Sequence, residues 1–328
     1  MGSKYRLLPW IQEVLSGLEF TSALDAFSGS GSVAYLLKAM GKDVVANDRL
    51  AFSSTIARAI VENSTERLTD AEVARLITAN PEADDFIERT FTDIFFTPAD
   101  LRFLDRVWSN LGQLRSPAKR DIAIAALVRS CAKRQPRGVF TVAGDPEQYK
   151  DGRRDLQLSL EEHFIEHVAA YNAAVFDHGG GSAATHSDIF ELDVEAPDLV
   201  YMDPPYVPRA DDNCYVKRYH FLEGLATYWQ GQEILHGTRV KKLKKPYTPF
   251  SYRRSAVDAF DRMFARFRDS ILVLSYSSNG FPDLDELVRL MKRYKRRVDV
   301  QERAHRYHFG THDRAVRNSV TEYLIVGR

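Results

Sequence analysis

A short apolar run that ends in two prolines constrains the fold of this chain more than any other stretch. Residues 198–202 are mostly apolar, which predicts a buried strand of a parallel sheet, and Asp203-Pro204-Pro205-Tyr206 follows at once. Each proline fixes φ and lacks an N–H for the ladder, so the strand must stop there. We therefore expect a rigid turn at a strand's carboxyl end, the edge at which open α/β sheets bind ligands.

The turn from Asp203 to Tyr206 presents groups that suit a planar amine. The amine hydrogens can be donated to the Asp203 carboxylate and the Pro204 carbonyl, while the ring that carries the amine stacks on Tyr206. This arrangement predicts chemistry on the exocyclic amine of a base. The alternative is a turn that merely closes the strand, with Asp203 as an ordinary turn residue.

Strand-like and helix-like segments alternate on both sides of a long interruption. The alternation predicts an α/β fold with a doubly wound, mostly parallel sheet of the Rossmann-like kind, and the last two strands are expected to be antiparallel at one edge. The expected strands cover residues 21–27, 43–46, 183–187, 198–202, 271–276, a segment opening at 298, and 320–326; the expected helices cover residues 5–18, 32–40, 51–63, 219–229, 256–267 and 284–294.

The interruption predicts a mainly helical insertion at residues 64–182, with breaks near Pro81, Pro98 and Pro117 and a final glycine joint. The catalytic domain would then comprise residues 1–63 and 183–328. Residues 135–154, 207–218 and 236–254 are predicted to be loops, the second of them mobile and the third basic.

A glycine-containing turn lies between the first expected strand and its helix. In Asp25-Ala-Phe27-Ser28-Gly29-Ser-Gly31, the two glycines allow a sharp turn and close approach of a ligand to the backbone. Asp48 follows the second strand, about twenty residues on, where a carboxylate can accept hydrogen bonds from ribose hydroxyls. The third glycine of the dinucleotide pattern is absent, so an uncharged nucleoside end is favoured over phosphate; a plain tight turn is the alternative.

Asp188 and Ile189 follow the third expected strand. The Asp188 carboxylate can accept a hydrogen bond from the adenine amine of the same nucleoside. It can equally well cap a helix, and both interpretations stay open.

The composition is that of a globular protein, with 44% hydrophobic and 27% charged residues and a formal net charge of zero. Neither a membrane-length apolar run nor a signal-peptide core is evident, and two cysteines make no disulfide framework, so we expect a cytoplasmic protein. His305, His308 and His312 have no acidic or cysteine set to complete a metal site, and none is predicted. Basic clusters include residues 129–137, 241–245 and 253–254; each is either a solvated surface or part of a face that follows phosphates.

Taken in chain order, these motifs resemble those of the Dam-like, alpha-class DNA adenine N6-methyltransferases, which use S-adenosylmethionine. The matching positions are Lys4-Tyr5 to Trp10, Asp25 to Gly31, Asn47-Asp48, Asp188 and Asp203 to Tyr206. Within the insertion, Arg137-Gly-Val-Phe140 looks like part of the segment with which this family meets DNA, and residues 275–280 and 317–323 look like strands bordering the target-base pocket.

The resemblance implies roles for individual residues. Asp203, Pro204, Pro205 and Tyr206 would hold the target adenine; the cofactor would be bound by Tyr5, Asp25, Phe27, Ser28, Gly29, Gly31, Asp48, Asp188 and Ile189; and DNA would be bound by Arg134, Arg137, Lys241, Lys242, Lys244, Lys245 and Arg253. The opening helix lacks the Gly-Gly-Lys ending of close Dam relatives, and the insertion holds only fragments of the DNA-reading pattern, so no recognition sequence is implied.

The sequence thus predicts a methyltransferase acting on the N6 amine of an adenine flipped out of double-stranded DNA, either in a restriction-modification system with a cognate endonuclease or as a solitary methylase. We expect it to act as a monomer and without a membrane. An RNA base methyltransferase and an inactive nucleic-acid-binding subunit are the alternatives. Protein glutamine methylation is disfavoured, because such enzymes generally carry Asn where this chain has Asp203.

Overall fold

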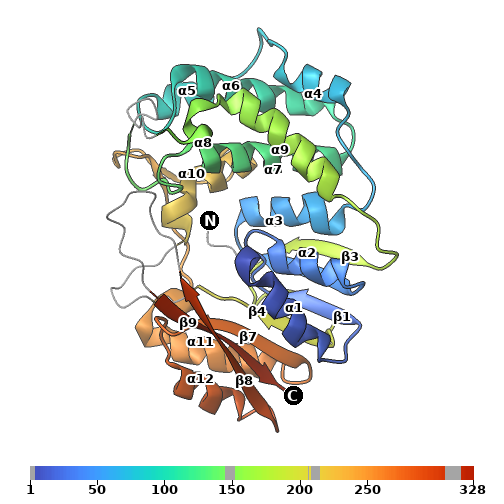
Figure 1. Ribbon diagram of the computed structural model, residues 1–328. Coiled ribbons are helices and arrows are strands. Elements are labelled where there is room, and N and C mark those ends of the chain that lie inside the picture. The colour runs from blue at the N-terminus through green and yellow to red at the C-terminus, as the bar shows by residue number, and fades with distance from the viewer. Residues whose placement is uncertain (1–3, 145–151, 206, 208–214, 307–318) are drawn as a thin grey trace. The chain divides into compact units, whose positions relative to one another are not determined.

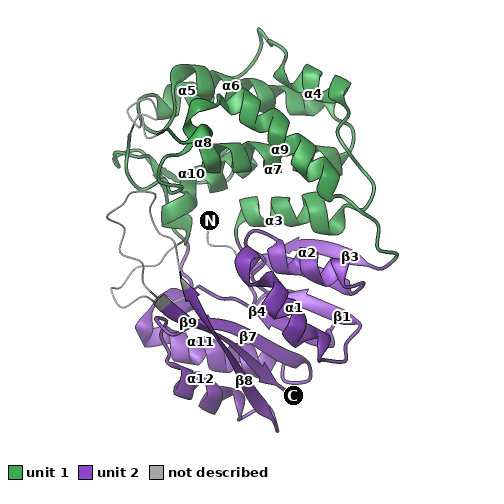
Figure 2. Cartoon of the chain, viewed as in Figure 1, with its two compact units in different colours: residues 1–2, 50–179, 215–245 green, residues 3–49, 180–214, 246–328 purple. Residues whose placement is uncertain are grey.

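The computed structural model describes residues 4–144, 152–205, 207, 215–306 and 319–328 (Figure 1). Among these residues, contacts divide the chain into two compact units (Figure 2). The helical unit comprises residues 50–179 and 215–245, and the sheet unit comprises residues 4–49, 180–207 and 246–328.

The sheet unit is built on seven strands in the order β3-β2-β1-β4-β7-β9-β8. The first five are parallel, whereas β9 runs antiparallel to both β7 and β8. The prediction of a doubly wound, mostly parallel sheet with antiparallel final strands is therefore confirmed. The strands are β1 (Ser22–Asp25), β2 (Asp43–Asp48), β3 (Ser182–His186), β4 (Leu199–Met202), β7 (Ile271–Ser277), β8 (Val298–Arg306) and β9 (Ser319–Gly327).

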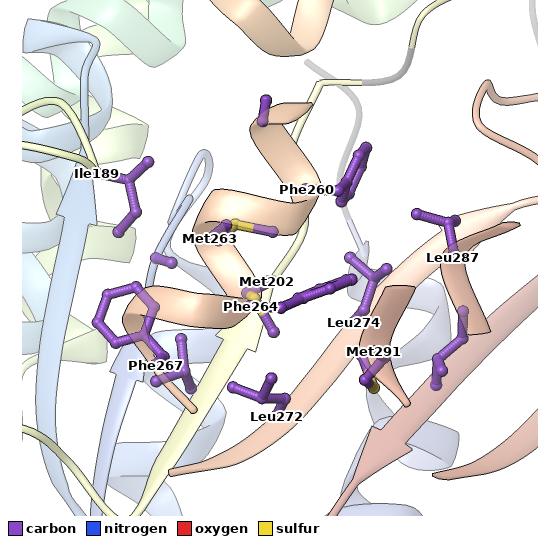
Figure 3. Packing of buried hydrophobic residues seen from close by; sticks show 14 of the residues in the cluster. Ile189, Met202, Phe260, Met263, Phe264, Phe267, Leu272, Leu274, Leu287 and Met291 are labelled. Atoms are coloured by element: carbon purple, nitrogen blue, oxygen red, sulfur yellow. The ribbon is translucent and has the colours of Figure 1, made fainter. Parts of the chain in front are cut away.

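Side chains alternate across the central strands, and both sets are buried, as expected of a parallel sheet covered on its two faces. Leu24, Met202 and Leu274 belong to a core formed with the helices α11 (Arg253–Arg266) and α12 (Leu284–Met291), and Figure 3 shows Met263, Phe264 and Leu287 of those helices in the same cluster. The helical elements of this unit are η1 (Lys4–Leu7), α1 (Leu8–Ser16), α2 (Ser32–Ala39), η5 (Pro249–Ser251), α11 (Arg253–Arg266) and α12 (Leu284–Met291).

Two helices of the helical unit, α6 (Pro98–Asn110) and α7 (Pro117–Arg134), begin at a proline. Pro98 and Pro117 occupy the first turns of α6 and α7, where a missing N–H costs nothing, and Thr97 and Ser116 cap these helices with their hydroxyls. The elements are α3 (Ala51–Ala57), the π-helical turn η2 (Arg58–Glu62), α4 (Asp70–Ile77), α5 (Phe86–Phe91), α6 (Pro98–Asn110), η3 (Leu111–Gln113), α7 (Pro117–Arg134), α8 (Arg154–Gln157), α9 (Leu160–Ala174), α10 (Tyr215–Thr227) and the hairpin β5 (Ile234–Leu235) with β6 (Lys242–Leu243).

The unit boundaries differ from the ranges predicted for the domains. The helical unit starts at residue 50 rather than 64, and it also contains residues 215–245, which the sequence pattern assigned to the catalytic domain. Aromatic packing explains the second difference, because Phe221 and Trp229 lie against Phe91 of α5 at centroid distances of 5.0 and 4.8 Å. Gly224 permits this packing, since a Cβ there would meet the Trp229 indole at 2.1 Å.

Two predicted loops also contain regular structure. Residues 215–218, predicted to be part of a mobile loop, open α10, while residues 208–214 lie outside the described residues. The basic loop predicted at residues 236–254 contains the strand β6, the short helix η5 and the start of α11. Within the described ranges, no helix is both long enough and apolar enough to span a membrane.

Candidate functional site

The order of strands reverses between β1 and β4. The chain passes from β1 outward to β2 and β3, and then returns to place β4 on the other side of β1. In such sheets the ligand crevice lies at the carboxyl ends of the strands beside this reversal. Asp25 and Asp48 end β1 and β2, and Asp188 and Asp203 follow β3 and β4, so the topology carries these four predicted site residues to one edge of the sheet.

The turn after β1 is fixed to the end of β2 by hydrogen bonds. Gly29 N–H donates to Asp48 Oδ2 at 2.8 Å, and Ser28 N–H donates to the Asn47 carbonyl at 2.8 Å. Gly29 and Gly31 have φ values of 51° and 74°, a region that favours glycine. The turn therefore holds a sharp backbone bend, and no side chain at either glycine hinders a ligand.

Asp25 is buried at the base of this turn. Its Oδ2 accepts a hydrogen bond from Ala34 N–H of α2 at 2.9 Å, whereas its Oδ1 has no hydrogen-bond partner among the described residues. Burial raises the pKa of Asp25 to about 8, and the negative charges of Asp203 and Asp48 act in the same direction. A buried acid with an unsatisfied oxygen is the kind of group that a cationic ligand would stabilise.

Asp188 is held by its own turn and by an arginine. Its Oδ1 accepts from Phe190 N–H at 3.0 Å, and its Oδ2 lies 3.0 Å from a guanidinium nitrogen of Arg49. The same Arg49 nitrogen donates to the Tyr247 carbonyl at 2.6 Å. Asp188 therefore caps a short turn rather than a helix, and Arg49 links it to the segment that precedes η5.

Aromatic rings line the neighbouring part of this edge. Phe250 of η5 stacks on Phe190, with centroids 5.7 Å apart and planes at 5°, and it meets the Phe27 ring edge-on at 5.4 Å. Ile189 is buried in the core cluster beneath them. Phe27 and Ile189, both predicted to contact a cofactor, are thus connected through one aromatic group.

Asp203 faces a lysine from the start of the chain. Lys4 Nζ lies 3.4 Å from Asp203 Oδ1 and 3.1 Å from Oε2 of the buried Glu322 on β9. Pro204 is buried and Pro205 is half-buried, while Tyr206 lies outside the described residues. Tyr5, predicted to bind the cofactor, is 73% exposed.

Residues 1–277 match the family model of the D12 class N6 adenine-specific DNA methyltransferases. The chain belongs to this family. It is also 30% identical to the type II methyltransferase M2.HphI of Haemophilus parahaemolyticus, over 94% of this chain and 90% of that protein. The type II methyltransferase M.CviAII of Paramecium bursaria Chlorella virus 1 is 23% identical, over 99% of this chain and 96% of the relative, whereas the modification methylase LlaI of Lactococcus lactis subsp. lactis is 24% identical over 90% of this chain and 48% of its own length.

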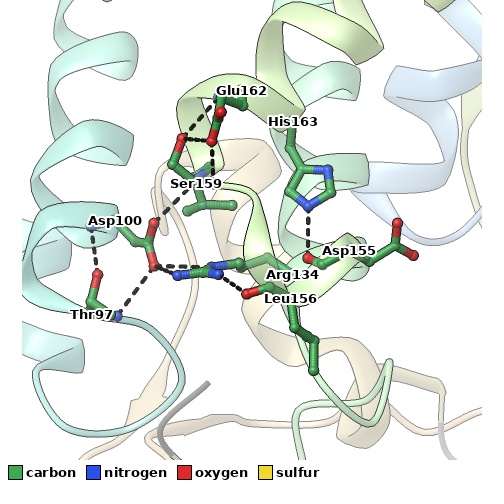
Figure 4. Close-up of polar contacts among 9 residues, drawn as sticks. Thr97, Asp100, Arg134, Asp155, Leu156, Ser159, Glu162 and His163 are labelled. Atoms are coloured by element: carbon green, nitrogen blue, oxygen red, sulfur yellow. Dashed lines mark hydrogen bonds and ion pairs between the residues drawn. The ribbon is translucent and has the colours of Figure 1, made fainter. Parts of the chain in front are cut away.

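Among the residues of this methyltransferase predicted to bind DNA, Arg134 makes its contacts within the helical unit. Its side chain is buried, pairs with Asp100 Oδ2 at 3.4 Å and donates to the Leu156 carbonyl (Figure 4). Thr97 N–H, at the start of α6, also donates to Asp100. The ion pair between Asp100 and Arg134 links α6 to α7. The guanidinium thus has partners inside the helical unit that support a structural role, and its predicted contact with DNA stays a prediction.

The remaining cations predicted to bind DNA lie at or near the surface of their units. Arg137 is exposed in the helical unit, and there Lys244 pairs with Glu233 at 2.7 Å while Lys241 Nζ donates to the His236 carbonyl. Arg253 belongs to the sheet unit, where its guanidinium lies 4.6 Å from the centre of the Phe281 ring. Lys242 and Lys245 complete the set as half-buried and exposed residues of the hairpin segment.

Two further residues of the candidate site escaped the sequence-based prediction of roles: Arg49 and Phe250. Arg49 directly follows Asp48, but nothing in the sequence indicates that its side chain reaches Asp188. Glu322 lies within residues 317–323, which are predicted to border the target-base pocket, but its contact with Lys4, 318 positions away, is not evident from the sequence. No group of three metal-binding side chains occurs in the portion of the chain that the structure describes.

Proposed function

We propose that this methyltransferase binds S-adenosylmethionine at the turn after β1 and transfers its methyl group to the N6 amine of an adenine held by Asp203. The proposal rests on one observation: Asp25, Asp48 and Asp203 lie close together where the strand order reverses. The chain that carries this site belongs to a family of adenine-specific DNA methyltransferases. Asp25 and Asp203 are close enough for each charge to affect the other.

The residues around the turn fit a nucleoside that carries a positive charge. The open backbone at Gly29 and Gly31, with Phe27 and Ser28, would accommodate the amino-acid part, and the unsatisfied oxygen of Asp25 suits its cationic character. Asp48 would accept from the ribose, and Asp188 with Ile189 would border the adenine ring, with Tyr5 at the rim. When bound, S-adenosylmethionine supplies an electrophilic methyl group on a sulfonium, which leaves as a neutral thioether.

Asp203 and Pro204 prepare the acceptor nitrogen. The lone pair of an adenine amine is delocalised into the ring, which makes the nitrogen a poor nucleophile. Hydrogen bonds from its two hydrogens to the Asp203 carboxylate and the Pro204 carbonyl favour a tetrahedral nitrogen whose lone pair can form the new N–C bond. The methylated nitrogen is then cationic, and the proton on the hydrogen bond to Asp203 is released through that carboxylate to solvent.

The target amine is inaccessible inside a duplex, so the adenine must be extruded at a cost of a few kcal/mol, and Tyr206 would stack on the extruded ring. The exposed cations Arg137, Lys244, Lys245 and Arg253, with the half-buried Lys241 and Lys242, would neutralise phosphates. In this proposal the sheet unit performs the transfer, and the helical unit, with its basic hairpin, recognises the DNA.

The names of the relatives bear on the biological role. Two are named type II methyltransferases and one is named a modification methylase. We place this enzyme likewise in a restriction-modification system, acting in the cytoplasm as a monomer, with a cognate endonuclease as its genetic partner.

The test is an assay with methyl-labelled cofactor and three acceptors: duplex DNA, single-stranded RNA of the same sequence, and duplex DNA in which every adenine is replaced by 2-aminopurine, which lacks the 6-amino group. We expect label in the first acceptor alone, recovered as N6-methyladenine after nuclease digestion. Label only in RNA, or label in the adenine-free duplex, would overturn the proposal.

A further inference from the structure

Lys4 connects the carboxylate proposed to hold the target amine with a second, fully buried carboxylate. The ammonium lies 3.1 Å from Glu322 Oε2 and 3.4 Å from Asp203 Oδ1, and the side chains of Lys4 and Glu322 are 9% and 0% exposed. Charge-assisted hydrogen bonds from ammonium to carboxylate are usually 2.7–2.9 Å long. The longer distance to Asp203 means that Lys4 attracts this carboxylate without forming a short charge-assisted hydrogen bond to it.

The charges around Asp203 show why such a cation is needed. The charges of Asp203 and Asp48 are two of the causes that raise the pKa of Asp25 on β1 to about 8, so Asp25 holds a proton at neutral pH and these three acids form one crowded group. Buried Tyr201 on β4 stays neutral, because burial and the Asp203 charge both raise its pKa, while Lys4 acts in the opposite direction. Of these groups, Lys4 is the one with a positive charge. Its ammonium donates a hydrogen bond to Glu322 on β9.

We propose that Lys4 is a positioning residue that keeps Asp203 ionised and fixed in one orientation, and that Glu322 prevents the ammonium from closing fully onto Asp203. The ionised carboxylate of Asp203 is a stronger acceptor of the N6 hydrogen than the protonated acid, because protonation turns one of its two oxygens into a donor. Crowded carboxylates favour protonation of one member, and a cation within about 4–6 Å opposes it. The proposal rests on the role assigned to Asp203 in the proposed function.

The proposal predicts a change in protonation that can be measured without catalysis. Carbon-13 NMR of aspartate-labelled apoenzyme, with the Asp203 carboxyl signal assigned by its loss in Asp203→Asn, gives the titration of that carboxyl. In Lys4→Met the midpoint should rise by one to three pH units relative to the wild type, which is the usual effect of removing a close opposite charge. An unchanged midpoint would overturn the proposal.

Single-turnover transfer at saturating cofactor and DNA supplies the second measurement. The acidic limb of the pH–rate profile should move upward in Lys4→Met by the same amount, and Lys4→Arg should restore it in part. Glu322→Gln should lower the plateau rate several-fold without raising the limb, because the released ammonium then occupies the Asp203 oxygens. A Lys4→Met enzyme with the wild-type profile, or a Glu322→Gln enzyme with the wild-type plateau, would contradict the assignment.

Lys295 provides a matched control, because it is another buried lysine of the sheet unit whose ammonium donates to the carbonyls of Arg268 and Ser270. Lys295→Met should lower the melting temperature and leave both the Asp203 titration and the pH profile unchanged. If Lys4→Met alone does not fold, the double variant Lys4→Met/Glu322→Gln avoids an unpaired buried charge, and its Asp203 midpoint is read in the same way. Failure of the wild type to methylate adenine would defeat the proposed function but leave the NMR titration to decide the role of Lys4.

Discussion

The two units bury carboxylates in different ways. In the helical unit, Asp105 accepts from Tyr228 Oη at 2.6 Å and from two backbone N–H groups, and Asp100 is paired with Arg134 and also accepts from backbone N–H groups. In the sheet unit, Asp25 keeps an oxygen without a hydrogen-bond partner among the described residues, and Asp203 shares the Lys4 ammonium with Glu322. Carboxylates whose oxygens are satisfied fix helices to one another, whereas Asp25, with one oxygen that has no partner among the described residues, lies at the proposed site of chemistry.

Removing Asp203 should produce the largest effect on activity. In Asp203→Ala the N6 hydrogens lose their charged acceptor, and we expect the transfer rate to fall by about 10³-fold or more. Cofactor binding, measured by calorimetry, should change little, because the proposed function assigns Asp203 to the acceptor base rather than to the cofactor. The variant Asp193→Ala, at an exposed position, serves as the control. If the transfer rate of Asp203→Ala stays within tenfold of the wild-type rate, Asp203 does not have the role proposed for it.

Arg134 and Arg137 sharpen the comparison within one short segment. Arg134→Met leaves Asp100 as an unpaired buried charge, so the free energy of unfolding should fall by about 3–5 kcal/mol. Arg137→Met, at an exposed position, should leave stability within about 0.5 kcal/mol of the wild type. Urea denaturation of the two variants measures both values. Equal losses of stability would show that the buried pair does not support the helical unit as described.

Asp25 makes the stability of the apoenzyme depend on pH. Its pKa is about 8 in the folded protein and near 3.8 when unfolded, so between these values the folded state binds a proton that the unfolded state has released. The free energy of unfolding should therefore fall as the pH rises from about 4 to about 8. In Asp25→Asn, where the amide oxygen can still accept from Ala34 N–H, this slope should be weaker. Parallel stability curves for the two proteins, from urea denaturation between pH 5 and pH 8, would disprove the assignment.

The smallest effect is expected at a helix cap in the helical unit. Thr97 Oγ1 accepts from Asp100 N–H at 3.2 Å, and Thr97→Ala should cost about 1 kcal/mol of unfolding free energy. Thr97→Ser keeps the hydroxyl and should retain most of that stability. Thermal melting of the two variants in parallel tests the cap, and identical melting temperatures would show that it contributes nothing.

The sequence predicts the sheet unit well because its site depends on topology. A carboxylate that directly follows a parallel strand must lie at the carboxyl edge of the sheet, so Asp25, Asp48, Asp188 and Asp203 need only correct strands to be placed. The same reasoning predicts no partner for Asp188 or Asp203, because Arg49 and Lys4 reach them through tertiary contacts.

The helical unit is less predictable from its sequence. Charge alone does not distinguish Arg134, which is buried, from Arg137, which is exposed three positions later. Likewise, residues 215–245 follow a strand of the sheet in sequence, yet their aromatic side chains pack in the helical unit. Such outcomes depend on which side chains meet across helices, and local periodicity carries no information about that.

The ion pair between Lys4 and Glu322 has a consequence for the order in which the molecule can become active. Lys4 is translated before the aspartates of the proposed site, whereas Glu322 is translated after them, on a strand that lies between β7 and β8 in the sheet. A nascent chain can therefore contain Asp25, Asp48, Asp188 and Asp203 and still lack the anchor for its lysine. If the proposed role of Lys4 is correct, methylation should begin only after β9 has been synthesised and has joined the sheet.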